Sequence, residues 1–342
     1  MSNFLPLLDV VRSRIKPPVL IVLGAPRLVI EMVRHLQLPD TACFQMDLFQ
    51  AQRLREELTA ENLTASVQAE PDLWNLAATF QTVLFPAPPR GERELKIDMV
   101  DQGFHVLQAK GTFITLSPVT HDELFPGWMK KVFGKSAPAH SADGTVIWST
   151  KQQSRERRRH EMWVQARVDD GSPLRFLTRP GVFAYGRLDL GTRAILQAIE
   201  ISPGERILDL GCGAGAAGLA AARRAEPGGH VTFADSNLRA IELAEMNARQ
   251  CGLTDFRACA AIRLEGLEQE SYDVVLANPP YYAQQAIARM FVERSAKLLR
   301  PGGRFYLVTK QLDFVEPIVR ESFGEVELFE SRGYIILVAI KN

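Results

Sequence analysis

The chain has 342 residues, of which 46% are hydrophobic and 23% charged, and its formal net charge is zero. This length predicts two domains with a core each, and the composition is that of an ordinary globular protein. The zero net charge excludes a global attraction to nucleic acid, so any basic surface has to be local.

Cysteine usage and hydropathy argue against metal and membrane partners. The four cysteines are Cys43, Cys212, Cys251 and Cys259. They form neither a CxxC pair nor a metal-ligand spacing, which predicts buried thiols in a reducing compartment. No apolar run reaches the length of about 18 residues that a membrane span needs, and the first residues do not resemble a signal peptide. We therefore expect a cytoplasmic protein without a metal.

The N-terminal half contains short apolar runs that predict strands of an α/β domain. These runs lie at residues 19–24, 42–44, 80–84 and 110–116. We place this first domain at residues 1–120. A connector is predicted to follow at residues 121–175.

The connector carries the most basic segment of the chain. Residues 151–160 read Lys-Gln-Gln-Ser-Arg-Glu-Arg-Arg-Arg-His, and Trp163 follows closely. A charge run of this kind either forms a solvated face or contacts phosphates, since arginine forks match phosphate oxygens. The tryptophan either stacks on a base or packs in the protein.

The C-terminal half, residues 176–342, alternates predicted strands and helices more clearly. Strands are predicted at 206–210, 230–234, 273–277, 304–309, 326–330 and 334–340, and helices at 216–225, 238–251 and 283–299. This alternation predicts an α/β fold with a doubly wound, mostly parallel sheet. The last two strands read as an antiparallel hairpin at its edge.

The two halves repeat the same landmarks in the same order, which predicts a duplicated domain; two unrelated α/β domains are the alternative. In this comparison Gly24 corresponds to Gly211, and Asp47 corresponds to Asp235. The first copy has Gly24 but lacks the second and third glycines of the other copy, and its third strand ends in Phe-Pro-Ala-Pro-Pro at residues 85–89. Proline removes amide donors, so this copy is predicted to be degenerate and to serve as structure or as a substrate-binding domain.

A glycine loop joins the first strand and helix of the C-terminal half. It reads Asp-Leu-Gly-Cys-Gly-Ala-Gly at residues 209–215, and Asp235 ends the next strand. Such loops also bind dinucleotides. However, an acid at Asp209 suits a ligand with an ammonium group and would repel a pyrophosphate, which favours S-adenosylmethionine over NAD. Asp235 is placed to accept both hydroxyls of a ribose.

The strand at residues 273–277 ends in Asn278-Pro279-Pro280-Tyr281. Ligands of open α/β sheets bind at the carboxyl ends of the strands. The Asn278 amide oxygen and the Pro279 carbonyl are predicted to grip an amino group, while Tyr281 stacks on the planar acceptor. The motif therefore predicts methylation of a planar nitrogen.

With these motifs, residues 181–341 resemble the class I S-adenosylmethionine-dependent methyltransferases. The two tandem copies, and the segment Pro180–Thr192 before the glycine loop, are similar to the bacterial ribosomal RNA guanine-N2 methyltransferases. The resemblance implies two tandem Rossmann-like methyltransferase domains with a degenerate N-terminal copy. It implies that Asp209, Gly211 and Gly213 hold the methionine part and that Asp235 holds the ribose. It adds Thr192 and Ala261 to the cofactor site. Since no side chain at residues 258–263 can accept a hydrogen bond from the adenine amine where this family often has a polar residue, a backbone carbonyl is expected there.

The expected function is transfer of a methyl group to N2 of a guanosine in ribosomal RNA, either free or in a ribosomal subunit particle, by a monomer or weak dimer. Three alternatives remain at this point. The acceptor could be adenine N6 or a protein glutamine, because the same tetrapeptide occurs in enzymes for those substrates. The chain could also be a non-catalytic RNA-binding protein with a vestigial cofactor pocket.

Overall fold

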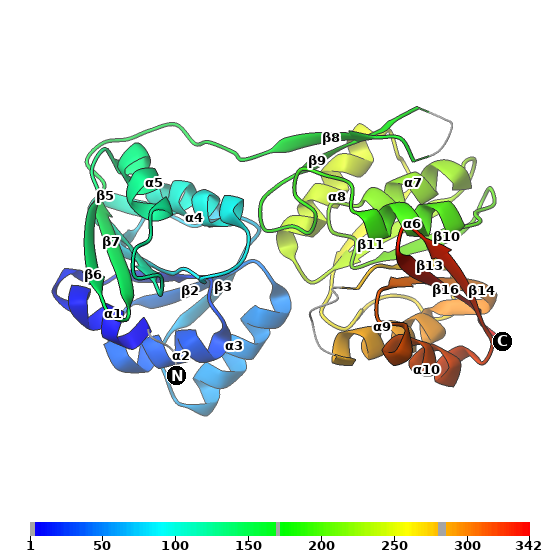
Figure 1. The fold of residues 1–342 in the computed structure, drawn as a ribbon, viewed down its shortest axis with the longest axis horizontal. Coiled ribbons are helices and arrows are strands. Elements are labelled where there is room, and N and C mark those ends of the chain that lie inside the picture. Colours follow the sequence, from blue (N-terminus) through cyan, green and yellow to red (C-terminus); the bar gives the residue numbers. More distant parts are fainter. Residues whose placement is uncertain (1–3, 169–171, 280–284) are drawn as a thin grey trace. The chain divides into compact units, whose positions relative to one another are not determined.

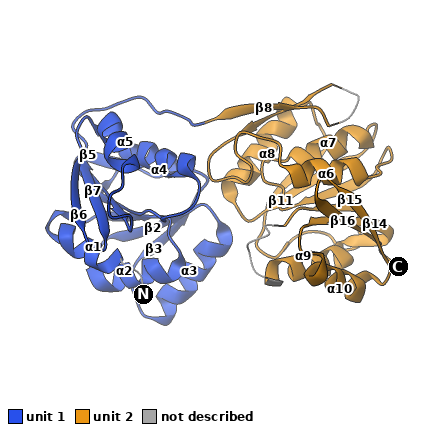
Figure 2. Ribbon diagram, viewed as in Figure 1, with its two compact units in different colours: residues 1–160 blue, residues 161–342 orange. Residues whose placement is uncertain are grey.

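The computed structural model describes residues 4–168, 172–279 and 285–342. The chain divides into two compact units, residues 1–160 (unit 1) and residues 161–342 (unit 2), shown in Figures 1 and 2. Each unit contains one seven-stranded sheet with helices packed on both faces. In the part of the chain that the structure describes, no helix is long and apolar enough to cross a membrane.

Unit 1 is an α/β unit that ends in an antiparallel hairpin. Its elements are α1 (Phe4–Val11), β1 (Val19–Val22), α2 (Pro26–Leu36), β2 (Thr41–Gln45), α3 (Leu48–Ala60), β3 (Ser66–Ala69), β4 (Phe80–Pro86), α4 (Arg93–Val106), β5 (Leu107–Ser117), α5 (Leu124–Phe133), β6 (Ala137–Ser141) and β7 (Gly144–Thr150), with 3₁₀ turns at Arg12–Arg14 and Leu73–Asn75. The sheet order is β3-β2-β1-β4-β5-β7-β6.

Unit 2 repeats that plan after a short two-stranded sheet of its own. Its elements are β8 (Met162–Ala166), β9 (Leu174–Thr178), α6 (Leu190–Ala198), β10 (Arg206–Leu210), α7 (Ala216–Ala225), β11 (His230–Asp235), α8 (Leu238–Gln250), β12 (Phe256–Ala260), β13 (Tyr272–Ala277), α9 (Gln285–Leu298), β14 (Leu299–Thr309), α10 (Leu312–Phe323), β15 (Val326–Ser331) and β16 (Tyr334–Ile340). The sheet order is β12-β11-β10-β13-β14-β16-β15, and β8 pairs with β9.

The two sheets have the same strand order, element for element, which confirms the predicted tandem fold. In each unit the central strands pair in parallel, and the last two strands form an antiparallel hairpin. The mostly parallel sheet with an antiparallel C-terminal hairpin is therefore as expected.

The central strands are buried on both faces, which explains why they read as continuous apolar runs. Along β1, Val19 and Ile21 pack into one core cluster, whereas Leu20 and Val22 pack into another on the opposite face. This division follows from the two-residue period of a strand. Two cores thus sandwich each sheet.

The predicted connector at residues 121–175 is shorter than expected. Residues 124–150 form α5, β6 and β7, and β7 pairs with β5 as part of the first sheet. The boundary between the units falls after His160, not at residue 120. The hairpin was not expected because Pro138 and several polar residues interrupt β6.

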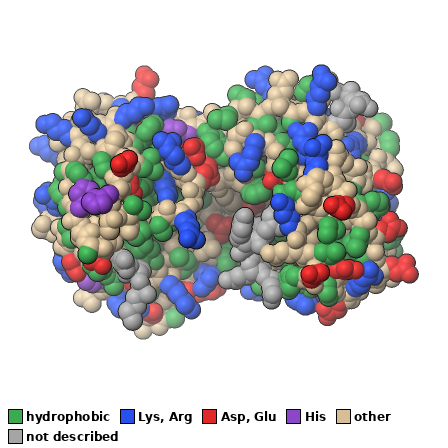
Figure 3. Space-filling model, viewed as in Figure 1, with side chains coloured by type: hydrophobic (Ala, Val, Ile, Leu, Met, Phe, Trp, Pro, Cys, Tyr) green, Lys and Arg blue, Asp and Glu red, His purple; other side chains and the backbone are tan. Residues whose placement is uncertain are grey.

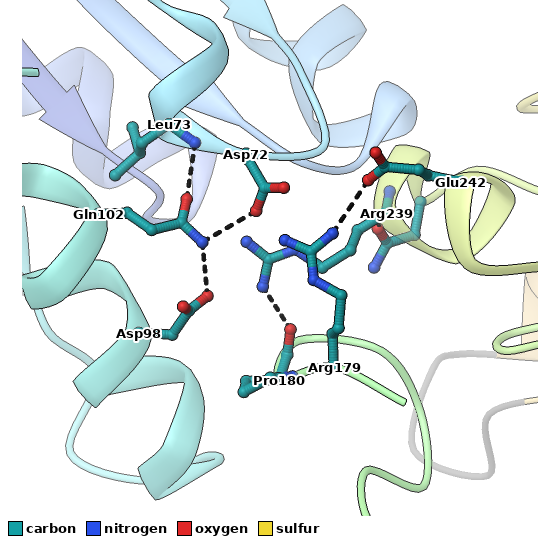
Figure 4. A network of polar contacts seen from close by, with 9 residues as sticks. Asp72, Leu73, Asp98, Gln102, Arg179, Pro180, Arg239 and Glu242 are labelled. Carbon is teal, nitrogen blue, oxygen red and sulfur yellow. Dashed lines mark hydrogen bonds and ion pairs between the residues drawn. The ribbon is translucent and has the colours of Figure 1, made fainter. Parts of the chain in front are cut away.

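A buried amide holds α4 of unit 1 against the 3₁₀ turn that begins at Leu73. Gln102 donates from Nε2 to Asp98 Oδ2 at 2.8 Å and to Asp72 Oδ1 at 2.9 Å. Its Oε1 accepts from the Leu73 N–H at 2.8 Å (Figure 4). This side chain is fully buried, and its hydrogen bonds satisfy both ends of the amide.

Candidate functional site

The predicted site residues of unit 2 lie at the carboxyl ends of three neighbouring strands, β11, β10 and β13. In this sheet β10 pairs in parallel with both of the others. Asp209, Asp235 and Asn278 therefore come from adjacent strands, although they are far apart in sequence. This edge of a parallel sheet is where ligands of α/β folds bind.

The glycine loop at residues 211–215 turns the chain from β10 into α7. Gly211, Gly213 and Gly215 have φ of +70°, +53° and +84°. These left-handed conformations favour glycine because a side chain would clash with the backbone. The Gly211 N–H donates to the Ala234 carbonyl at 2.8 Å, so the loop is held against the end of β11.

Asp235 fixes the loop from the neighbouring strand. Its Oδ2 accepts from the Gly213 N–H at 3.0 Å, and its Oδ1 accepts from the Asn237 N–H at 2.9 Å. Asn237 in turn caps α8 by accepting from the Arg239 N–H. The carboxylate therefore has a fixed orientation beside the glycine loop.

Asp209 lies beneath the loop as a buried carboxyl group. Its Oδ2 accepts from the Gly218 N–H in the first turn of α7 at 2.7 Å. Burial, with the nearby charge of Asp235, raises the pKa of Asp209 to about 7, although the Gly218 N–H opposes this shift. Burial, with the charges of Asp235 and Asp209, raises the pKa of the Cys212 thiol well above its usual value.

Asn278 is held by two residues from the beginning of α6. Its Nδ2 donates to Asp189 Oδ2 at 3.0 Å and to Thr192 Oγ1 at 3.2 Å. Asp189 also caps α6 by accepting from the Thr192 N–H at 3.1 Å. Because an ionised carboxylate only accepts hydrogen bonds, it fixes which end of the Asn278 amide carries the NH₂ group.

Of the other predicted site residues, the structure describes some and leaves two outside the described residues. Pro279 follows Asn278 and is buried. Pro280 and Tyr281 lie outside the described residues. Thr192, predicted as a cofactor residue, contacts Asn278. The Ala261 N–H donates to the Asp235 carbonyl at 3.0 Å, so Ala261 adjoins the end of β11.

Three residues that hold the site together were not singled out from the sequence. Asp189 is one. Asn247 of α8 accepts from the Leu177 N–H at 2.7 Å and donates to the carbonyls of Leu177 and Ala214, both at 2.9 Å. Arg239, also on α8, donates to the Pro180 carbonyl (Figure 4).

A sequence signal for two of these residues exists. Arg239 and Asn247 are fully buried, and both lie on the helix face that carries Ala240, Leu243 and Ala244. A polar side chain in the apolar stripe of a helix has to find partners inside the protein. Here the partners are the glycine loop and the segment that leads to Asp189.

Unit 1 has neither the two acids nor the asparagine at the corresponding positions. By strand register and order, Ile21 stands in place of Asp209, Gln45 in place of Asp235, and Pro86 in place of Asn278. The correspondence of Asp47 with Asp235 was therefore wrong by two residues. Asp47 caps α3 by accepting from the Gln50 N–H, whereas Gln45 donates to the Gly24 carbonyl at 3.0 Å.

The loop between the first strand and helix is also shorter in unit 1. It has three residues, 23–25, where unit 2 has five, 211–215. Pro26 begins α2 and supplies no N–H group to a ligand. The first copy therefore keeps the fold but lacks this binding edge.

Comparisons with known proteins agree with this picture. Residues 173–338 match the family model of the methyltransferase small domain. The "Ribosomal RNA large subunit methyltransferase G" of Pseudoalteromonas translucida is 31% identical over 184 residues, which are 51% of this chain and 47% of that protein. The "Ribosomal RNA small subunit methyltransferase C" of Pseudomonas entomophila is 28% identical over 223 residues, 62% of this chain and 65% of that protein. The matched region thus spans less than two thirds of either relative.

A solved structure shares the fold of nearly the whole chain. It is the T. thermophilus 16S rRNA N2 G1207 methyltransferase (RsmC) in complex with AdoMet and guanosine. The TM-score is 0.75 at 22% sequence identity, and the match covers 98% of this chain and 92% of that chain. The tandem arrangement of two α/β units therefore occurs in both proteins.

Proposed function

Because residues 173–338 match the family model of the methyltransferase small domain, we propose that this protein is an S-adenosylmethionine-dependent methyltransferase that modifies N2 of a guanosine in ribosomal RNA. The observation that carries the proposal is the Asn278 amide, held by Asp189 beside a glycine loop and an acidic strand end. Those groups grip an amine and a nucleoside-bearing cofactor, respectively.

The residues of the loop fit the proposed cofactor. The bound cofactor would supply a methyl group on a positively charged sulfur. The glycine loop allows close approach of a ligand to the backbone, and Asp235 offers carboxylate oxygens for ribose hydroxyls. Asp209 is a buried acid with a raised pKa, and a nearby positive charge would favour its ionised form.

The acceptor amine would be held by Asn278 and the Pro279 carbonyl. An exocyclic amine is a poor nucleophile because its lone pair is delocalised into the ring. Two acceptors on its N–H groups favour a geometry in which the lone pair faces the methyl group. In the transfer, a new N–C bond would form as the S–C bond of the cofactor breaks with its electrons left on sulfur, and one N–H proton would then be lost to solvent. Most of the acceleration comes from positioning.

The names of the similar proteins support ribosomal RNA as the substrate. Both relatives described above carry ribosomal RNA methyltransferase names, and the solved structure with the same tandem fold is an N2 G1207 methyltransferase. A guanine amine inside a duplex must be unpaired or flipped out to reach such a site.

The test uses ribosomal RNA or ribosomal subunits from cells that lack the protein. After incubation with enzyme and S-adenosylmethionine, the RNA is digested to nucleosides and analysed by mass spectrometry. We expect N2-methylguanosine. Appearance of N6-methyladenosine instead would show that the acceptor is wrong. Calorimetry that detects no S-adenosylmethionine binding would support a non-catalytic RNA-binding protein.

The variant Asn278→Ala tests the role assigned to the Asn278 amide. It should reduce the methylation rate by about 10²–10³-fold, as expected for loss of one preorganised polar group. The S-adenosylmethionine Kd should stay within a few fold, because the amide is assigned to the acceptor. A variant with nearly full activity would remove Asn278 from this role.

A further inference from the structure

The basic segment at residues 151–160, named the arginine strap here, is fixed to unit 1. At its beginning, the Lys151 N–H donates to the Gly111 carbonyl at 2.9 Å, and Lys151 Nζ donates to the Leu107 carbonyl at 2.6 Å. Figure 1 shows this part of the chain running past α5 and α4. The strap is thus no free linker over this stretch.

The buried carboxylate of Asp101 holds the strap at two further residues. Asp101, which is 2% exposed, accepts from His160 Nε2 at 2.6 Å and pairs with Arg155 at 3.3 Å. The residues between these anchors are Glu156, Arg157, Arg158 and Arg159, and all four are exposed. Fixing both ends of this short stretch reduces the entropy that its side chains lose on binding a partner.

The guanidinium groups lie over two tryptophan rings. Arg157 and Arg159 are 5.9 and 5.8 Å from the centre of the Trp74 ring. Arg158 lies 5.9 Å from the centre of the Trp128 ring, and Lys131 of α5 lies 4.5 Å from the same centre. The rings therefore gather cations from the strap and from α5 on one surface of unit 1.

This surface is locally strongly positive in a chain of zero net charge. The strap has five Lys or Arg residues and one Glu. In the described part of the chain, neither Arg157 nor Arg158 makes an ion pair. Burial, together with the charges of Lys151, Arg157 and Arg155, lowers the pKa of His105 to about 4. In the view of Figure 3, Lys and Arg side chains line the upper edge of unit 1.

We propose that the arginine strap, with Lys131, is a docking surface for the phosphate backbone of the RNA substrate. This inference rests on the proposed function for its choice of partner. Arginine forks match phosphate oxygens, and a row of fixed cations suits a polymer with one charge per nucleotide. The degenerate copy would then contribute substrate binding while unit 2 contributes the chemistry.

An acidic protein segment is the competing partner, because arginine forks match carboxylates as well as phosphates. The choice of RNA follows from the proposed function, and the two tryptophan rings hold the guanidinium groups of Arg157, Arg158 and Arg159 in place. Contacts of this kind carry no base sequence, so the surface should bind RNA by charge and leave recognition of the base to unit 2.

The test compares full-length variants by fluorescence anisotropy with a labelled single-stranded RNA oligonucleotide of mixed sequence. The variant R157Q/R158Q/R159Q removes three charges from the strap. Its control, R34Q/R53Q/R55Q, removes three charges from α2 and α3 of the same unit, where Arg34 and Arg55 are exposed and Arg53 is half-buried. Arg34 and Arg53 each pair with a glutamate on the surface.

The strap variant should bind RNA more weakly and lower the slope of log K against log salt by about 2–3, since each phosphate contact contributes about 0.7–0.9. The control should retain the slope. R157K/R158K/R159K should also retain the slope but bind more weakly, because lysine keeps the charge without the fork. This conservative variant separates phosphate contact from simple packing on Trp74 and Trp128.

Equal slopes for the strap variant and the control would overturn the proposal. So would a strap variant that loses affinity for a labelled polyglutamate peptide while its RNA slope is unchanged, because the strap would then recognise an acidic protein segment. Calorimetry of the strap variant with S-adenosylmethionine separates this outcome from failure of the proposed function. Cofactor binding without strap-dependent RNA binding refutes only the docking surface.

Discussion

An amide side chain has two chemically different ends, and Asp189 determines which end of Asn278 faces it. The Asp189 carboxylate and the Thr192 hydroxyl receive the NH₂ group. A hydrogen bond to a charged group contributes about 1.5–3 kcal/mol. Asp189 is therefore a positioning residue for the proposed reaction, since it acts through Asn278.

Asp189→Ser separates this role from helix capping. Serine remains a good N-cap for α6 but is too short to reach the Asn278 amide. We expect kcat to fall by about 10–100-fold, from loss of about 1.5–3 kcal/mol of orientation. The KM for S-adenosylmethionine and the Tm should stay near their original values.

Asp189→Asn is the intermediate variant, because asparagine keeps the cap and the reach but has neither the charge nor the acceptor-only character of the carboxylate. Its kcat should fall by less than that of Asp189→Ser. Steady-state kinetics with thermal denaturation checks both variants. An unchanged kcat in Asp189→Ser would show that the contact is structural only.

At the residue scale, the sequence predicted the groups that stand in recognisable motifs. Asn278, Asp209 and Asp235 lie at the expected strand ends. Asp189 could not be paired with Asn278, because 89 residues separate them and only the fold brings them together. The cofactor and catalytic roles of all these residues stay predictions.

At the scale of elements, two glycines inside helices differ in the space that an added methyl group would find. A Cβ at Gly218 of α7 would lie 2.5 Å from Phe233 and 2.9 Å from Asp209 Oδ2. A Cβ at Gly127 of α5 would meet no atom within 4 Å. The two helices therefore respond oppositely to the same substitution.

Gly218→Ala should lower the free energy of unfolding by about 1–3 kcal/mol, because the added methyl group forces its neighbours apart. Gly127→Ala should raise the free energy of unfolding by about 0.4–1 kcal/mol, because alanine loses less backbone entropy in a helix. Urea denaturation of both variants measures this difference. The same sign of change in both would contradict the packing described for α7.

Buried strands were predictable as elements because they form continuous apolar runs. The helix α10 and the strands β6 and β7 were not expected. Pro317 interrupts the pattern of α10, and Pro138 interrupts that of β6. At these places tertiary packing outweighs local propensity.

At the scale of the whole molecule, the chain carries two copies of one fold and a polar binding edge in only one of them. The repeated landmarks predicted the duplication. They did not predict the boundary at His160, because the final hairpin of unit 1 is short and partly polar. Similar strand order with different side chains is a reminder that function depends on the site and not on the fold.

Hydrogen exchange of the intact chain can test this asymmetry, with unit 1 as an internal control. S-adenosylmethionine should slow exchange of amides in residues 211–215 and 235–237, because a ligand suppresses local opening of the site that it binds. Residues 23–25 and 45–47 should exchange at unchanged rates. Protection of both loops to the same degree would show that the first copy also binds the cofactor.

The buried Asp209 links the stability of the ligand-free fold to its affinity for a positively charged ligand. Its raised pKa means that an ionised carboxyl group destabilises the ligand-free fold at neutral and higher pH, relative to the unfolded chain. A cation bound above the glycine loop would lower that pKa again. Part of the affinity for a sulfonium or ammonium ligand would then come from removing the unfavourable free energy of this buried negative charge, and not from new contacts alone.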